Sequence, residues 1–184
     1  YYAYARNNPI LFNDPNGKNA KITINSETKS IHIKSNIYIY GPDSSLDVAQ
    51  RMQNNIMNEW NQSWKYYDPN TNITYNVEFE IIVKDTNVLN AFFERGEDDN
   101  RIKIMTRDKD DNRTRSFVKK GDRGVWRGDL ADPSPHEYGH LVGLKDRYDE
   151  KGANIGWEGN IMGEPAMQGI VEQRNIDSIV APFV

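Results

Sequence analysis

Two histidines lie four residues apart in the chain, at His136 and His140, and Glu137 follows the first of them. On an α-helix, residues four apart lie on the same face, so both imidazoles can reach one metal ion. A carboxylate beside them can accept a proton from a water that the metal activates and return it to a leaving amine. This spacing constrains the chain more than any other feature, because it predicts a helix and a metal site together.

A third ligand is expected a short way downstream. Zinc at a catalytic site takes three protein ligands and keeps a fourth position for water. Gly143 can adopt the left-handed conformation that ends a helix, so the chain can turn back and bring Asp146 to the ion. The chain has no cysteine, so its zinc ligands must be nitrogen and oxygen atoms. We therefore expect His136, His140 and Asp146 to bind Zn²⁺, with Glu137 as the catalytic base. The alternative is that the histidines are ordinary surface or core residues.

The start of this helix has two interpretations. Asp132 can cap the helix, with Pro133 at the first helical position, where a missing N–H costs nothing. Alternatively, Ser134 is the cap and Glu137 its capping-box partner, which would turn Glu137 toward the backbone and away from the metal. We favour Asp132 as the cap.

Residues 136–146 read HExxHxxGxxD, and residues 159–163 read GNIMG. Together they resemble the metzincin clan of zinc metallopeptidases. The commonest third ligand in that clan is histidine, whereas Asp146 stands at this position here, as in the snapalysin-like branch with its HExxHxxGxxD pattern. The resemblance implies a methionine turn, in which Met162 forms an apolar floor beneath the metal; an ordinary buried methionine is the alternative. It also implies an α+β fold, a metzincin-like zincin with a twisted upper sheet, two main helices, an active-site cleft and a small lower C-terminal part.

Two further features follow from the same resemblance. Some branches carry a tyrosine two residues after the methionine as a transition-state donor, but this chain has Glu164 there, which leaves Tyr138 or Tyr148 as candidates. Residues 117–126 would form the edge strand that lies above the cleft and pairs with an extended substrate. A surface hairpin around residues 121–122 is the alternative. The candidate edge residues are Phe117, Val118, Val125 and Trp126.

The N-terminal segment carries a second resemblance. Residues 2–10 (YAYARNNPI) and 14–17 (DPNG) are similar to the closing segment of the Rhs/YD-repeat core, in which a YxYAxNNP run ends in DPxG. The resemblance implies that residues 1–18 end such a core and that residues 19–184 are its cargo, often a polymorphic toxin. Its partners would then be the core shell and an immunity protein. Read for local chemistry alone, both runs form turns and predict an irregular arm.

Hydrophobic periodicity predicts the rest of the domain. Alternating isoleucines at 22–24 and 31–39 predict a hairpin or two successive strands with one buried face, with His32 on the polar side and at the surface. Residues 44–64 predict an amphipathic helix that Ser44 or Ser45 opens. Further strands are expected at 77–83 and 102–104, and a last helix is expected near the C-terminus. The apolar stripe of the amphipathic helix comprises Ala49, Met52, Ile56, Trp60 and Trp64.

The net negative charge of the chain limits the classes of partner that we expect. The net charge of −4 and the pI near 5.4 disfavour broad attraction to nucleic acid or anionic lipid, so a protein or peptide substrate is expected. No apolar run is long enough for a membrane span, and the first residues lack a secretory signal pattern.

Together, these features predict a zinc endopeptidase that hydrolyses peptide bonds. We expect it to be the toxic effector domain of an Rhs-family protein, secreted or delivered to a target cell within a larger exported polypeptide. The alternatives are a secreted protease that is not a toxin, a zinc-stabilised binding module without catalysis, and a nuclease or other toxin activity.

Overall fold

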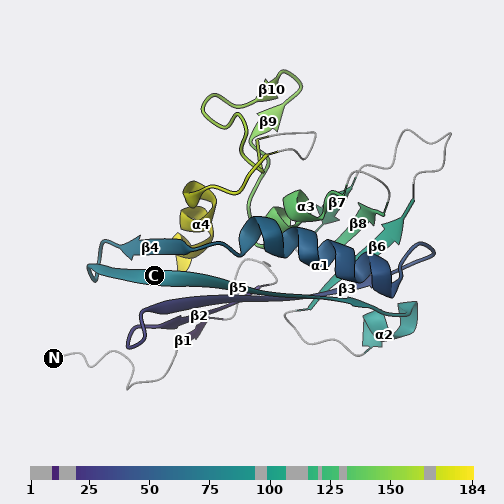
Figure 1. Ribbon diagram of the computed structural model, residues 1–184, viewed down its shortest axis with the longest axis horizontal. Coiled ribbons are helices and arrows are strands. Elements are labelled where there is room, and N and C mark those ends of the chain that lie inside the picture. The colour runs from purple at the N-terminus through teal and green to yellow at the C-terminus, as the bar shows by residue number, and fades with distance from the viewer. Residues whose placement is uncertain are drawn as a thin grey trace.

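The computed structural model describes residues 10–12, 20–93, 99–106, 116–119, 122–128, 132–163 and 169–184. Within them the protein has an α+β fold, in which eight strands form one curled, open sheet with helices packed against it (Figure 1). No helix in this part of the chain is both long and apolar enough to cross a membrane.

Strand β3 (Ser30–Tyr40) lies at the centre of the sheet. Along one side it pairs in parallel with β5 (Ile73–Asp85). Along the other side its first half pairs antiparallel with β2 (Lys21–Asn25), and its second half pairs in parallel with β6 (Asp99–Met105). Two strands therefore share one side of β3, and the sheet branches there.

The remaining strands extend the sheet outward. Beyond β6 come β8 (Arg123–Arg127), which is parallel to it, and then β7 (Phe117–Lys119), which is antiparallel to β8. Strand β4 (Trp64–Asp68) pairs antiparallel with β5, and β1 (Ile10–Phe12) pairs antiparallel with β2. Because β1 falls within residues 1–18, the segment predicted to end an Rhs core contributes a strand to this sheet.

The predicted alternation of buried and polar residues is confirmed. In β2 and β3 every second residue is buried, namely the isoleucines and Ser35, and the residues that alternate with them are not. The side chain of His32 is 53% exposed, and its Nδ1 lies 3.3 Å from Oε2 of Glu78 on β5. His32 is therefore a surface residue, as predicted.

The amphipathic helix is α1 (Leu46–Trp60), and it packs against β5. Ser45, one of the two predicted caps, accepts a hydrogen bond from the backbone of the first turn. The prediction that the helix continues to Trp64 was wrong, because the backbone leaves helical geometry at Asn61 and Trp64 begins β4. The indole of Trp64 still reaches the helix and donates a hydrogen bond to the carbonyl of Trp60 (2.7 Å). The buried residues of the helix are Ala49, Met52, Ile56 and Trp60.

The C-terminal part of the chain is smaller. Strands β9 (Tyr148–Asp149) and β10 (Gly152–Ala153) pair antiparallel in a lobe that projects away from the sheet (Figure 1). Helix α4 (Gln173–Val180) packs against β4. The burial of Ile176, Ile179 and Val180 confirms the predicted terminal helix. The remaining elements are α2 (Val88–Phe93), α3 (Ser134–Leu141) and the 3₁₀ turn η1 (Ala181–Phe183).

Candidate metal centre

Helix α3 carries both histidines, and its start is fixed by the residues before it. The helix begins at Ser134, one residue later than expected, so Pro133 occupies the cap position and Pro135 falls in the first turn. The Asp132 carboxylate accepts a hydrogen bond from the backbone N–H of Ser134 (2.9 Å) and another from the side chain of Asn55 on α1 (2.7 Å). The prediction that Asp132 is the cap residue was therefore wrong by one position, although its carboxylate still satisfies the N–H of the first helical residue. No capping box forms at Ser134.

The end of α3 turns the chain back toward the histidines. Gly143 has a φ of +90°, the left-handed conformation predicted from the sequence. The backbone N–H of Leu144 donates to the carbonyl of Gly139 (2.8 Å) and closes the turn. The next residues then run beside α3, and Asp146 reaches the histidine rings.

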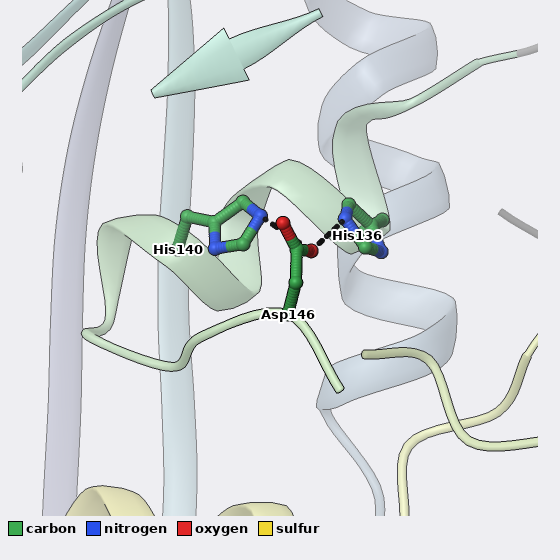
Figure 2. Close-up of side chains that lie close together, drawn as sticks. All are labelled: His136, His140 and Asp146. Atoms are coloured by element: carbon green, nitrogen blue, oxygen red, sulfur yellow. Dashed lines mark ion pairs between the residues drawn. The ribbon is translucent and has the colours of Figure 1, made fainter. Parts of the chain in front are cut away.

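His136, His140 and Asp146 form a group that could hold a metal ion. Their candidate ligand atoms all lie within 4.8 Å of one another. Nε2 of each histidine lies 3.3 Å from Oδ1 of Asp146, and both rings point toward the carboxylate (Figure 2). The side chains of His136 and Asp146 are 3% and 45% exposed, so the group is buried on the side of α3 and open to solvent on the side of Asp146.

In each histidine ring, the nitrogen that faces away from Asp146, Nδ1, is hydrogen-bonded to a backbone carbonyl. Nδ1 of His136 lies 2.7 Å from the carbonyl oxygen of Ile161, and Nδ1 of His140 lies 2.9 Å from that of Leu144. A carbonyl only accepts hydrogen bonds, so each Nδ1 carries a proton and each Nε2 is left to bind a metal. Such contacts are typical of metal-binding histidines, because they fix both the tautomer and the ring orientation.

Charge inside the group suits a cation. Burial raises the pKa of Asp146, but hydrogen bonds from His136 and His140 outweigh it and hold the pKa well below its usual range. Burial lowers the pKa of His140, but the carboxylate of Asp146 and the carbonyl of Leu144 outweigh it and raise the pKa. The carboxylate therefore stays ionised, and a metal at Nε2 of His140 competes with a proton. Metal affinity should fall as the pH falls.

Glu137 is buried beside these ligands, with 3% of its surface exposed. Its Oε2 has no hydrogen-bond partner within the described part of the chain. Burial raises the pKa of Glu137 to about 7, although His140 and His136 act to lower it. A carboxyl group with a pKa near neutrality can accept and release a proton at physiological pH, as a catalytic base requires.

Met162 lies in a tight turn that packs against α3. The turn is closed by the N–H of Gly163, which donates to the carbonyl of Asn160 (2.9 Å), and the side chain of Asn160 accepts from the N–H of Met162 (2.9 Å). Met162 is 1% exposed, and a Cβ on Gly139 would lie only 2.4 Å from its sulfur. The methionine therefore presses on the histidine-bearing helix, one residue before His140.

The two candidate tyrosines have different surroundings. Tyr138 is fully buried; its hydroxyl lies 3.0 Å from Oγ of Ser35, and its ring packs edge-on against Trp60. It belongs to the core. The ring centroid of Tyr148 lies 6.1 Å from that of His136, and its side chain is half-buried. Of the two, Tyr148 is the one beside a candidate metal ligand, His136.

The predicted edge strand is only partly an edge. Phe117 and Val118 lie on β7, the last strand of the sheet path, which contacts α3. Val125 and Trp126 lie on β8, whose backbone pairs with both β6 and β7, so the prediction that they belong to an edge was wrong. Trp126 is fully buried. Strands β7 and β8 pair antiparallel, which supports the alternative of a hairpin; Gly121, at its predicted turn, lies outside the described residues.

Sequence reasoning missed the groups that orient the ligands. The carbonyls of Ile161 and Leu144 belong to every residue type, so no sequence signal marks them. Asn160 was recognised only as part of the tight turn, and its buried hydrogen bonds to Glu172 (2.6 Å) and Asn175 (2.8 Å) were missed. An asparagine beside the glycine of a tight turn is the signal that would have suggested them.

No protein-family model matches this chain, and no curated protein matches it either. The function is therefore inferred from the geometry of the site.

Proposed function

We propose that this protein is a zinc-dependent endopeptidase. The observation that carries the proposal is the orientation of three candidate ligands. His136 and His140 have their Nδ1 atoms hydrogen-bonded to backbone carbonyls, while both Nε2 atoms lie 3.3 Å from the same oxygen of Asp146. Side chains fixed in this way are already arranged for a metal, so little ordering is needed when it binds.

Zinc is the metal that these donors favour. Two imidazole nitrogens and a carboxylate oxygen match its ligand preferences, and a site with three protein ligands leaves one position for water or substrate. Zinc bound there supplies a Lewis acid, which lowers the pKa of water and polarises a carbonyl. The group formed by His136, His140 and Asp146 has three members within the described residues, which favours a catalytic site over a closed structural one.

The arrangement around the site supports a metzincin-like zincin. Helices α1 and α3 pack together and α1 covers the sheet (Figure 1). Met162 packs against Gly139 of α3, and α4 follows later in the chain. These features agree with the upper sheet, two main helices and smaller lower part that the resemblance implies. Among the described strands, none pairs with the outer side of β7, and this supports substrate binding because an unpaired strand edge offers N–H and C=O groups to an extended peptide.

Each residue has a role in the proposed reaction. His136, His140 and Asp146 hold the metal. Glu137 takes a proton from the attacking water and passes it to the amine that leaves as the peptide bond breaks. Tyr148, whose ring lies beside that of His136, is the candidate to donate a hydrogen bond to the developing oxyanion.

We further propose that the peptidase acts as the toxic effector domain of an Rhs-type protein, delivered to a target cell and countered there by an immunity protein. The support is the N-terminal sequence: a YxYAxNNP run at residues 2–10 is followed by a DPxG run at residues 14–17, the same order as at the end of an Rhs core. Apart from β1, this segment lies outside the described residues. A YD-repeat region encoded upstream of Tyr1 would support this biological context; an unrelated upstream sequence would oppose it.

The test of the chemistry is Glu137→Gln. This variant removes the base and changes the shape of the side chain little, so zinc content should equal that of the unchanged protein while cleavage of casein and of a peptide library is lost. Glu78→Gln, an exposed position on β5, is the matched control and should keep both properties.

Three results would contradict the proposal. Proteolysis that persists in Glu137→Gln refutes the role of Glu137. Zinc binding without peptide cleavage by the unchanged protein indicates a binding module. Cleavage of plasmid or RNA in place of casein indicates a nuclease.

A further inference from the structure

Asp146 is the least enclosed of the three candidate ligands, with 45% of its side chain exposed, and it lies between α3 and β9 outside any helix or strand. Upstream, Leu144 is anchored twice: its N–H donates to the carbonyl of Gly139, and its carbonyl accepts from Nδ1 of His140. Downstream, the N–H of Arg147 donates to the carbonyl of Met162 (2.7 Å). The placement of Asp146 thus depends on what holds Arg147.

The side chain of Arg147 is held by an aromatic ring. Its Cζ lies 4.8 Å from the ring centroid of Trp157, and Cζ of Arg174 lies 4.9 Å from the same ring. We call Arg147, Trp157 and Arg174 the tryptophan clamp. Both guanidinium groups lie within the distance at which a cation is attracted to the face of an indole.

The clamp is itself fixed to the C-terminal part of the protein. Arg174, on α4, donates to the carbonyl of Gly156 (2.5 Å), and its Nε lies 2.9 Å from Oε2 of Glu172. The same carboxylate oxygen accepts from the side chain of Asn160 in the methionine turn (2.6 Å). One ring therefore connects α4, the methionine turn and the residue that follows Asp146.

The backbone of Trp157 also packs closely on that turn. A Cβ at Gly163 would lie 1.9 Å from the carbonyl oxygen of Trp157, so only glycine fits at this contact. The N–H of Trp157 donates to the carbonyl of Asn154, and the N–H of Asn154 donates to the carbonyl of Arg147. Backbone contacts at both the N–H and the carbonyl of Trp157 therefore fix the position of this residue.

We propose that Trp157 is a positioning residue for the metal site: the tryptophan clamp holds Asp146 where it can complete the ligand set. This inference rests on the metal site proposed above. When the clamp is lost, the segment around Asp146 samples more conformations, and the fraction of protein with all three ligands in place falls. The apparent affinity for metal falls by the same factor.

The test is a metal titration of Trp157→Leu and Trp157→Phe. Leucine fills space but offers no aromatic face to the guanidinium groups, whereas phenylalanine does. Trp157→Leu loses two cation–π contacts, those with Arg147 and Arg174. We expect this variant to bind Co²⁺ and Zn²⁺ about tenfold more weakly, which equals about 1.4 kcal/mol. Trp157→Phe should remain within about threefold of the unchanged protein. The Co²⁺ absorption spectrum of Trp157→Leu should also shift toward that of a site with one protein ligand fewer.

Trp64→Leu is the matched control, since Trp64 is a half-buried tryptophan on β4 whose indole bonds to Trp60 in α1. It should lose stability but keep its metal affinity and Co²⁺ spectrum. If Trp157→Leu does not fold, Arg174→Met removes one cation from the ring and should weaken metal binding by about threefold.

The outcomes separate the two proposals. Equal affinity in Trp157→Leu and the unchanged protein would overturn the role of the clamp and leave the metal site intact. An equal loss of affinity in Trp64→Leu would also overturn it, because general destabilisation would then be the cause. Failure of the unchanged protein to bind Co²⁺ or Zn²⁺ would overturn the metal site itself.

Discussion

The contact between Gly139 and Met162 predicts that Gly139→Ala destabilises the protein, although alanine is normally the better helix former. Gly139 lies inside α3, where replacing glycine with alanine stabilises by about 1 kcal/mol. Here the added Cβ would lie 2.4 Å from the sulfur of Met162 and 3.4 Å from Cζ2 of Trp60. Both neighbours are buried, Met162 at 1% and Trp60 at 0% exposure, so neither can move aside freely.

The size of the effect follows from the depth of the overlap. Overpacking a filled core costs about 1–3 kcal/mol. Since a separation of 2.4 Å is far shorter than real Cβ contacts, we expect the upper end of this range. Set against the helix-propensity gain of about 1 kcal/mol, Gly139→Ala should lower the free energy of unfolding by about 2 kcal/mol.

A double-mutant cycle with Met162→Ala tests the reasoning. Met162→Ala alone removes a buried side chain and should cost about 2–5 kcal/mol. In that background the sulfur is gone, so Gly139→Ala should become stabilising by up to about 1 kcal/mol. The effect of one substitution thus changes sign, with a coupling energy of about 3 kcal/mol between the two positions.

The assay is urea unfolding followed by circular dichroism, with excess chelator in every sample. The chelator is needed because a bound metal would add its own binding free energy to the stability of the folded state. A stabilised Gly139→Ala protein would refute the argument, and so would a loss of the same size in both backgrounds.

Two further predictions concern the site and its support. Asp146→Ala should lower zinc content in elemental analysis. Asp149→Ala, at an exposed position on β9, is the control and should leave zinc content unchanged. Full zinc content in Asp146→Ala would show that Asp146 is not a ligand. Tyr138→Phe removes the hydroxyl that lies 3.0 Å from the buried Oγ of Ser35. The free energy of unfolding should therefore fall by about 1–3 kcal/mol, while peptide cleavage stays unchanged. A stability equal to that of the unchanged protein would contradict the Tyr138 assignment, and a loss of cleavage at full zinc content would show that Tyr138 takes part in the reaction.

The sequence by itself determined the local parts of the fold and the site. The spacing of His136 and His140 places both on one face of α3, and Gly143 ends that helix in the left-handed conformation. The alternating isoleucines of β2 and β3 fix which face of the sheet is buried. These features follow from helix and strand periods and from the conformational freedom of glycine, all of which act over a few residues.

Only the tertiary structure decided which groups meet across the chain. It paired Nδ1 of His136 with the carbonyl of Ile161, buried Glu137, and brought two arginines from different segments to the ring of Trp157. It also made β8 an inner strand, which left Phe117 and Val118 at the edge. The reason is physical: a backbone carbonyl has the same chemistry in every residue, and burial or strand neighbours depend on contacts between residues far apart in the sequence.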